Sequence, residues 1–161
     1  MNENATNCNP DEEDVSFRLN LDPSTLSTAQ QKVIAFRQRR IIVNPRVARA
    51  MKTVRFAVTP FVEETRTSVD RWLSEGRGIG LSITFLFSYP KGGTKREKAA
   101  RREGSPVLSA KWGDLDNRAK AFIDALVKAG MLPDDHLISN LSLRKRYTLS
   151  KPSILISFFP D

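Results

Sequence analysis

Residues able to do chemistry are concentrated in one stretch of this chain, residues 113–136, which reads GDLDNRAKAFIDALVKAGMLPDDH. Asp114 and Asp116 come directly before an amphipathic segment, Lys120 lies within it, and Asp135 follows its end. Carboxylates are oxygen ligands that Mg²⁺ prefers, and one or two suffice when waters and substrate phosphates complete the shell. The stretch therefore predicts a site for a divalent metal ion, magnesium in the first place and manganese as an alternative.

The spacing of the first three residues constrains the start of the helix. Asp114 and Asp116 share a face only if the backbone there is extended, since two residues on a helix turn through about 200°. The helix is therefore expected to begin at or after Asp116, as its N-cap. Lys120, one turn later, can stabilise the charge that develops on a phosphate during attack, or it can form an ordinary salt bridge to Asp116 or Asp124.

Asp135 poses a problem of distance. The intervening helix, about thirteen residues, spans roughly 20 Å, while residues 131–135 in extended form can return roughly 17 Å. The acidic cluster can thus close within one subunit or be completed across a dimer, and the sequence leaves both open. Asp134 is interpreted as a turn residue or as a residue that supports the metal ligands without binding the ion. His136, a lone histidine at the start of a strand, is interpreted as structural.

The spacing of these residues resembles a known family signature. The run Asp114-Leu-Asp116-Asn117, then Lys120, Phe122-Ile-Asp-Ala-Leu126, Lys128-Ala-Gly130 and Asp134-Asp135, is similar to that of RusA-type Holliday junction resolvases. These are small homodimeric endonucleases, commonly carried by phages and prophages, that cut four-way DNA junctions with magnesium. The resemblance implies catalytic roles for Asp114, Asp116, Lys120 and Asp135, with the three aspartates as metal ligands. It also implies cleavage to ligatable 5′-phosphate and 3′-hydroxyl ends. The N-terminal third departs from the pattern at Leu21-Asp-Pro-Ser-Thr-Leu-Ser, where the family has a Pro-rich, Asn-containing turn.

Charge is unevenly distributed along the 161 residues, which carry 26 Lys and Arg against 18 Asp and Glu, a net charge of +8. Residues 1–14 hold five of the acidic residues and no basic one, so residues 15–161 keep 13 acidic residues against 26 basic ones. A basic body with an acidic leader indicates a nucleic-acid partner; ordinary solubility charge is the alternative. The leader, residues 1–14, is predicted to be disordered.

Nine basic side chains are the candidates for DNA contact, most of them in a predicted loop at 91–112, with a solvated charged loop as the alternative. They are Lys91, Lys95, Arg96, Lys98, Arg101, Arg102, Lys111, Arg144 and Arg146.

The cellular setting is indicated by what the composition excludes. A single cysteine, Cys8, cannot form an internal disulfide, which favours a reducing compartment. No apolar run reaches membrane-spanning length, and the N-terminus is acidic and unlike a signal peptide. We therefore expect a soluble cytoplasmic protein, and the family resemblance implies a phage- or prophage-encoded protein in a bacterial host.

Periodicity predicts a single domain over residues 15–161 of the α/β (mixed α+β) class, with about four strands in a mixed sheet and two or three helices. The family resemblance implies that this fold is RusA-like. In order, the elements are a strand at 15–21, an irregular stretch at 22–45 with a short strand at 41–43, two helices or one kinked at Pro60 over 47–76, a strand at 79–89, the loop at 91–112, a helix at 117–129, a polar-faced strand at 137–148 and a central or covered strand at 154–159.

The function that these observations favour is a structure-selective DNA endonuclease that resolves four-way junctions by magnesium-dependent phosphodiester hydrolysis. Paired nicks would come from a homodimer, with Val47–Leu73 and Ile79–Tyr89 as the best suppliers of an apolar interface. The first alternative is a non-catalytic DNA-binding protein on the same fold, and the second is a metal-dependent nucleotide-sugar transferase. The expected partner in the favoured reading is branched DNA, with no membrane association.

Overall fold

The structure, a computed structural model, describes residues 14–26, 32–35, 40–92, 94–108 and 113–161. Apart from Asp14, the predicted acidic leader lies outside the described residues. None of the described helices is both long and apolar enough to cross a membrane.

A four-stranded mixed sheet forms the body of the domain, as predicted. Its strands are β1 (Val15–Leu19), β4 (Ile79–Ser88), β5 (Ile138–Thr148) and β6 (Ser153–Pro160), in the order β1-β6-β4-β5. β4 and β5 run parallel, whereas β6 is antiparallel to both of its neighbours. The final strand therefore lies inside the sheet, which confirms the prediction from its two apolar faces.

Two consecutive helices cover one side of this sheet. α1 (Pro45–Val58) begins after Asn44, whose side chain accepts a hydrogen bond from the Arg46 backbone N–H at 3.0 Å. A 3₁₀ turn, η3 (Thr59–Phe61), follows and contains Pro60, and α2 (Val62–Ser74) continues the chain. The predicted interruption at Pro60 is confirmed, because proline lacks the N–H that a continuous helix needs there.

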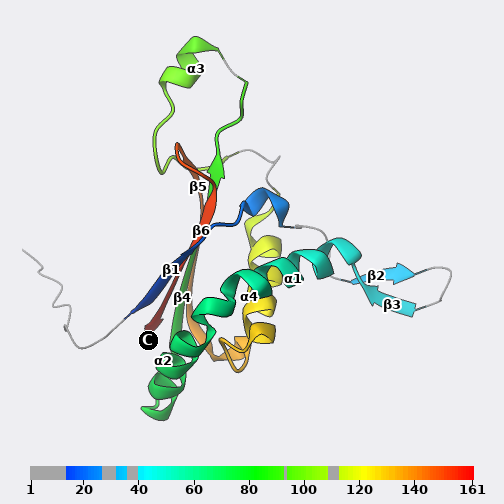
Figure 1. Ribbon diagram of the computed structural model, residues 1–161, viewed down its shortest axis with the longest axis vertical. Helices are drawn as coiled ribbons and strands as arrows, with labels where there is room; N and C mark the ends of the chain where they lie inside the picture. The colour runs from blue at the N-terminus through cyan, green and yellow to red at the C-terminus, as the bar shows by residue number, and fades with distance from the viewer. Residues whose placement is uncertain (1–13, 27–31, 36–39, 93, 109–112) are drawn as a thin grey trace, which may run out of the picture.

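The third long helix, α4 (Leu115–Ala129), lies in the connection between the parallel strands β4 and β5. It ends at Gly130, whose φ of 84° is the left-handed conformation that glycine adopts readily. α1 packs across α4, and all three long helices lie on the same side of the sheet (Figure 1).

The core lies between these helices and the sheet. Alternate residues of β4 point toward the helices and are fully buried, and the Phe85 ring meets Phe122 of α4 edge-on at 5.8 Å between centroids. The opposite face of the sheet carries small polar residues, among them Ser16 and Ser157, whose hydroxyls lie 2.9 Å apart. The apolar β4 side chains are buried in the core of the subunit and both β4 edges are paired, so of the strand Ile79–Tyr89, expected as part of a subunit interface, mainly the half-buried polar face remains open to a partner.

Several short elements of the described residues were not predicted. β2 (Lys32–Ala35) pairs with β3 (Arg40–Val43) as a separate antiparallel hairpin, within the stretch expected to be irregular apart from a strand at 41–43. A 3₁₀ turn, η1 (Pro23–Thr25), follows β1. α3 (Lys95–Ala99) interrupts the predicted loop and starts with a capping box, in which Thr94 and Glu97 bond to each other's backbone N–H.

Candidate active site

The motif helix begins two residues earlier than predicted. Gly113 has a φ of 68° and Asp114 is extended, with φ −76° and ψ 141°, so that Asp114 is the N-cap and the helix starts at Leu115. Asp116 was predicted as the N-cap, and this is wrong: it lies in the first turn, where the helix dipole stabilises a carboxylate. The Asp114 side chain makes no capping hydrogen bond, so its exposed carboxylate is not used in holding the helix.

A groove of about 310 Å³ between α4 and β5 collects most of the predicted catalytic residues. Its lining consists of four charged residues and five apolar ones, and we call it the α4–β5 groove: Asp116, Ala119, Lys120, Ile123, Asp124, Asp135, Ile138, Leu141 and Leu143. Three of the four residues predicted to be catalytic thus share one surface hollow. Asp114, the fourth, is not among the lining residues.

The charged residues are spread along the groove. Asp116, Lys120 and Asp124 follow each other at four-residue spacing on one face of α4. Asp135 belongs to the 3₁₀ turn η5 (Asp135–Leu137), which comes after the other end of the helix. Within the described ranges no three or more His, Cys, Asp or Glu side chains come together in a group that could hold a metal ion. The three predicted ligands therefore do not converge within one chain.

The turn that carries Asp135 is organised by its neighbours. The Asp134 carboxylate accepts a hydrogen bond from the His136 backbone N–H at 3.2 Å and lies 2.9 Å from the His136 Nδ1. The hydrogen bond from the His136 side chain is the largest of the contacts that lower the pKa of Asp134 to about 2. Asp134 is thus a turn residue, as predicted, and its pairing with His136 agrees with a structural role for that histidine.

The sequence comparisons bear directly on this groove. The family model described as endodeoxyribonuclease RusA matches residues 25–158 of the 161, which includes α4, β5 and the turn between them. The chain belongs to the RusA family. No curated protein matches it. The resemblance noted in the motif is confirmed, and the RusA match makes the chain an endodeoxyribonuclease by family.

Two sets of contacts, one partly buried and one buried, hold the RusA motif in place, and neither was anticipated. The Lys145 Nζ donates to the Gly113 carbonyl at 2.9 Å and so fixes the residue before Asp114. Arg118, in α4, is only 3% exposed and donates to the carbonyl oxygens of Leu26, at 2.9 Å, and Pro23. Burial lowers the pKa of Arg118 to about 10, so the guanidinium remains charged at neutral pH.

Asp124 was considered only as a salt-bridge partner, although its spacing from Lys120 already placed it on the groove side.

Most basic residues of the predicted loop lie on a projection formed by residues 89–92 and 94–105, which we call the basic arm. Figure 1 shows it extending beyond the ends of β4 and β5, with α3 at its tip. At its base the Tyr89 and Tyr147 rings stack at 4.3 Å, and the Tyr89 hydroxyl donates to the Arg102 carbonyl at 2.8 Å. The arm is therefore attached to β5, the strand that forms one wall of the groove.

Arg101 has a different part in the arm from its basic neighbours. Its guanidinium lies 5.2 Å from the centroid of the Tyr89 ring and donates to the carbonyls of Pro90 and Gly92, each at 2.6 Å. These contacts occupy a side chain that was predicted to contact DNA. The other predicted side chains of the described arm are exposed, namely Lys91, Lys95, Arg96, Lys98 and Arg102.

The remaining basic candidates are not brought to the groove. Side chains alternate along a strand, and because Leu141 and Leu143 line the groove, Arg144 and Arg146 point to the opposite face of the sheet. Lys111 lies outside the described residues.

Proposed function

We propose that this chain is a structure-selective endonuclease of the RusA family that resolves four-way DNA junctions by magnesium-dependent hydrolysis, with two subunits making paired nicks. The observation that carries the proposal is the coincidence of the family match with the α4–β5 groove, which presents Asp116, Lys120 and Asp135 together. The net charge of +8 and the exposed arm fit a polyanionic partner. The proposed place of action is the bacterial cytoplasm.

The donor set fits magnesium, because the ion prefers a few carboxylates and leaves other positions to water and substrate phosphate. In this proposal Asp114, Asp116 and Asp135 hold the ion, with manganese able to replace it. Such an ion, when bound, would polarise the scissile phosphate and lower the pKa of the attacking water. Lys120, near the positive end of the α4 dipole, stabilises the charge that develops on the phosphate. The apolar walls around these groups strengthen the electrostatic interactions inside the groove.

We further propose that the carboxylate set is completed by a second subunit. Asp116 lies in the first turn of α4, whereas Asp135 lies in η5, beyond the other end of that helix. The described residues of one chain contain no group of three acidic or other side chains that could hold a metal ion. Leu141, 45% exposed on the edge strand beside the groove, is an apolar side chain that a partner can cover. A two-fold axis would then place Asp135 of one subunit near Asp116 of the other.

Mixing two inactive variants tests this arrangement. If each site takes Asp116 from one subunit and Asp135 from the other, a heterodimer of Asp116→Asn and Asp135→Asn chains contains one intact site and one doubly altered site. We expect mixed and refolded samples to nick one strand of a junction, although each variant alone is inactive. Nicking is scored on denaturing gels with each strand labelled in turn. A mixture as inactive as its components would place both aspartates in the same subunit's site.

The whole proposal is tested on a synthetic four-way junction and a linear duplex of the same sequence, each with and without magnesium. We expect metal-dependent, symmetrical nicks in the junction, much slower cutting of the duplex, and a dimer by light scattering at micromolar concentration. Binding without cleavage would favour the alternative, a non-catalytic DNA-binding protein on the same fold. A monomer that cuts junction and duplex equally would leave only a generic nuclease.

A further inference from the structure

The outward face of α1 carries a concentration of positive charge that the sequence reasoning did not use. The helix has four basic residues and no acidic one, and all four are exposed: Arg46, Arg49, Lys52 and Arg55. At about 100° per residue, Arg49, Lys52 and Phe56 lie at the centre of the face opposite the buried side. None of the four cations makes an ion pair with any part of the chain that the structure describes.

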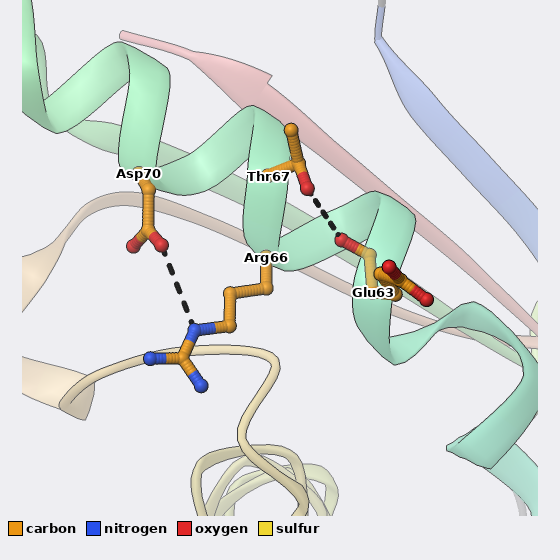
Figure 2. A network of polar contacts seen from close by, with 4 residues as sticks. All are labelled: Glu63, Arg66, Thr67 and Asp70. Carbon is orange, nitrogen blue, oxygen red and sulfur yellow. Dashed lines mark hydrogen bonds and ion pairs between the residues drawn. The ribbon is translucent and has the colours of Figure 1, made fainter.

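The next helix shows that this charge is a local feature. α2 contains three acidic and two basic residues, so its charges nearly cancel. Figure 2 shows Arg66 reaching along α2 toward Asp70, with Arg66 Nε 3.5 Å from a carboxylate oxygen of Asp70. An α2 cation thus has an acidic partner on its own helix, whereas α1 has no acidic residue to pair with its cations. Among the residues that the structure describes, no acidic side chain pairs with the α1 cations, which leaves them available to an external anion.

An exposed aromatic residue lies among these cations. Phe56 is 84% exposed, and it borders a hollow of about 600 Å³ beside α1. The hollow combines two cations, one acid and apolar surface, and is lined by Lys52, Arg55, Phe56, Thr59, Val62, Glu63 and Ala129. Cations next to an exposed ring are the combination with which proteins hold a nucleic-acid backbone while a base or sugar packs on the ring.

This face lies away from the α4–β5 groove. Asp116, Ala119, Lys120 and Ile123 line the groove from one side of α4, whereas Ala121 and Phe122 border the α1 contact. α1 therefore packs on α4 from the side away from β5, so the thickness of both helices, roughly 20 Å, separates its outward face from the groove. DNA held on that face cannot be the segment whose phosphate occupies the groove.

We propose that the exposed face of α1, centred on Arg49, Lys52 and Phe56, is a second DNA-binding surface that holds a junction arm other than the one being cut. This inference rests on the proposed function for the kind of DNA bound. Arg49 and Lys52 contact backbone phosphates, and Phe56 packs against a sugar or an unpaired base near the branch point. The surface would favour a branched substrate, because a straight duplex cannot occupy both places.

The test is binding to a four-way junction in EDTA, so that cleavage does not enter the readout. We compare Arg49→Ala/Lys52→Ala with a control of equal charge loss on α2, Arg66→Ala/Arg71→Ala, both made at exposed helix positions where alanine favours the helix. The α1 variant is expected to flatten the slope of log affinity against log salt by about 1.8, at about 0.9 per phosphate contact. The α2 variant is expected to keep the wild-type slope. Phe56→Ala is expected to lose affinity by roughly 10-fold with the slope unchanged.

Equal slopes for the two double variants would overturn the inference. So would α1 variants that bind the junction normally but turn a dimer into a monomer, since the face would then be a contact between subunits. If the wild-type protein binds no DNA at all, the proposed function fails as well. If the wild-type protein binds the junction and the α1 variants bind it equally well, only the proposal of a second DNA-binding surface fails.

Discussion

Asp114→Asn, Asp116→Asn and Asp135→Asn are each expected to abolish cleavage of a four-way junction while binding of the junction stays intact or becomes slightly tighter. Each substitution nearly preserves shape but removes a negative charge that would hold the metal ion and also repels DNA phosphates. Cleavage in magnesium and binding in EDTA, measured on the same preparations, separate the two effects.

A matched control is available one residue away. Asp134→Asn should cut at close to the wild-type rate, because asparagine caps a helical turn about as well as aspartate and the Asp134 side chain serves the η5 turn. Near wild-type cutting by any of the three main variants would remove that residue from the ligand set. Loss of cleavage in Asp134→Asn would show instead that the turn itself, and not the ligand charge, limits the reaction.

The second large effect is expected from the basic arm. Replacing Lys95, Arg96, Lys98 and Arg102 by alanine should flatten the salt dependence of junction binding by roughly 3.6 in log–log slope, at about 0.9 for each phosphate contact. Alanine is a strong helix former, so α3 is expected to persist in the variant. An unchanged slope would show that the arm is only a solvated surface.

Arg101 provides the contrast within the same arm. Arg101→Lys keeps the charge but loses the paired donation to Pro90 and Gly92 and the planar contact with Tyr89. We expect the salt slope to stay as in wild type, while affinity falls and the arm becomes more susceptible to proteolysis. A log–log slope lower by about 0.9, the value for one phosphate contact, would show that Arg101 itself contacts a DNA phosphate.

The sheet and the long helices could be predicted because their buried apolar residues recur in the sequence at the spacing of a strand or of a helix. β4 alternates apolar residues with mostly small or polar ones, and α4 presents an apolar stripe that ends at Gly130. β2 has no such period in its four residues and exists as a strand only because β3 pairs with it. The one-turn helix α3 is too short for a stripe, although the Thr94–Glu97 pair is a readable capping signal.

The candidate site was predictable in composition but not in arrangement. The aspartates and Lys120 could be selected from residue type and spacing, since helical spacing places Asp116 and Lys120 on one face. That Arg144 and Arg146 point away from the groove, and that Arg101 is held within the arm, depends on which side of β5 meets α4 and on contacts between distant residues. Short-range patterns do not carry that information.

The position of β6 has a consequence for the order in which the protein acquires activity during synthesis. β1 is made first, but its partner in the sheet is the last strand, with Val15 opposite Phe158, and β6 also pairs along β4. A nascent chain emerging at roughly 5–20 residues per second cannot complete the sheet until that strand has left the ribosome. Pairings of such long sequence separation also fold slowly. An enzyme able to cut DNA is thus expected to stay inactive on the ribosome, and prematurely terminated chains without β6 are expected to have no nuclease activity.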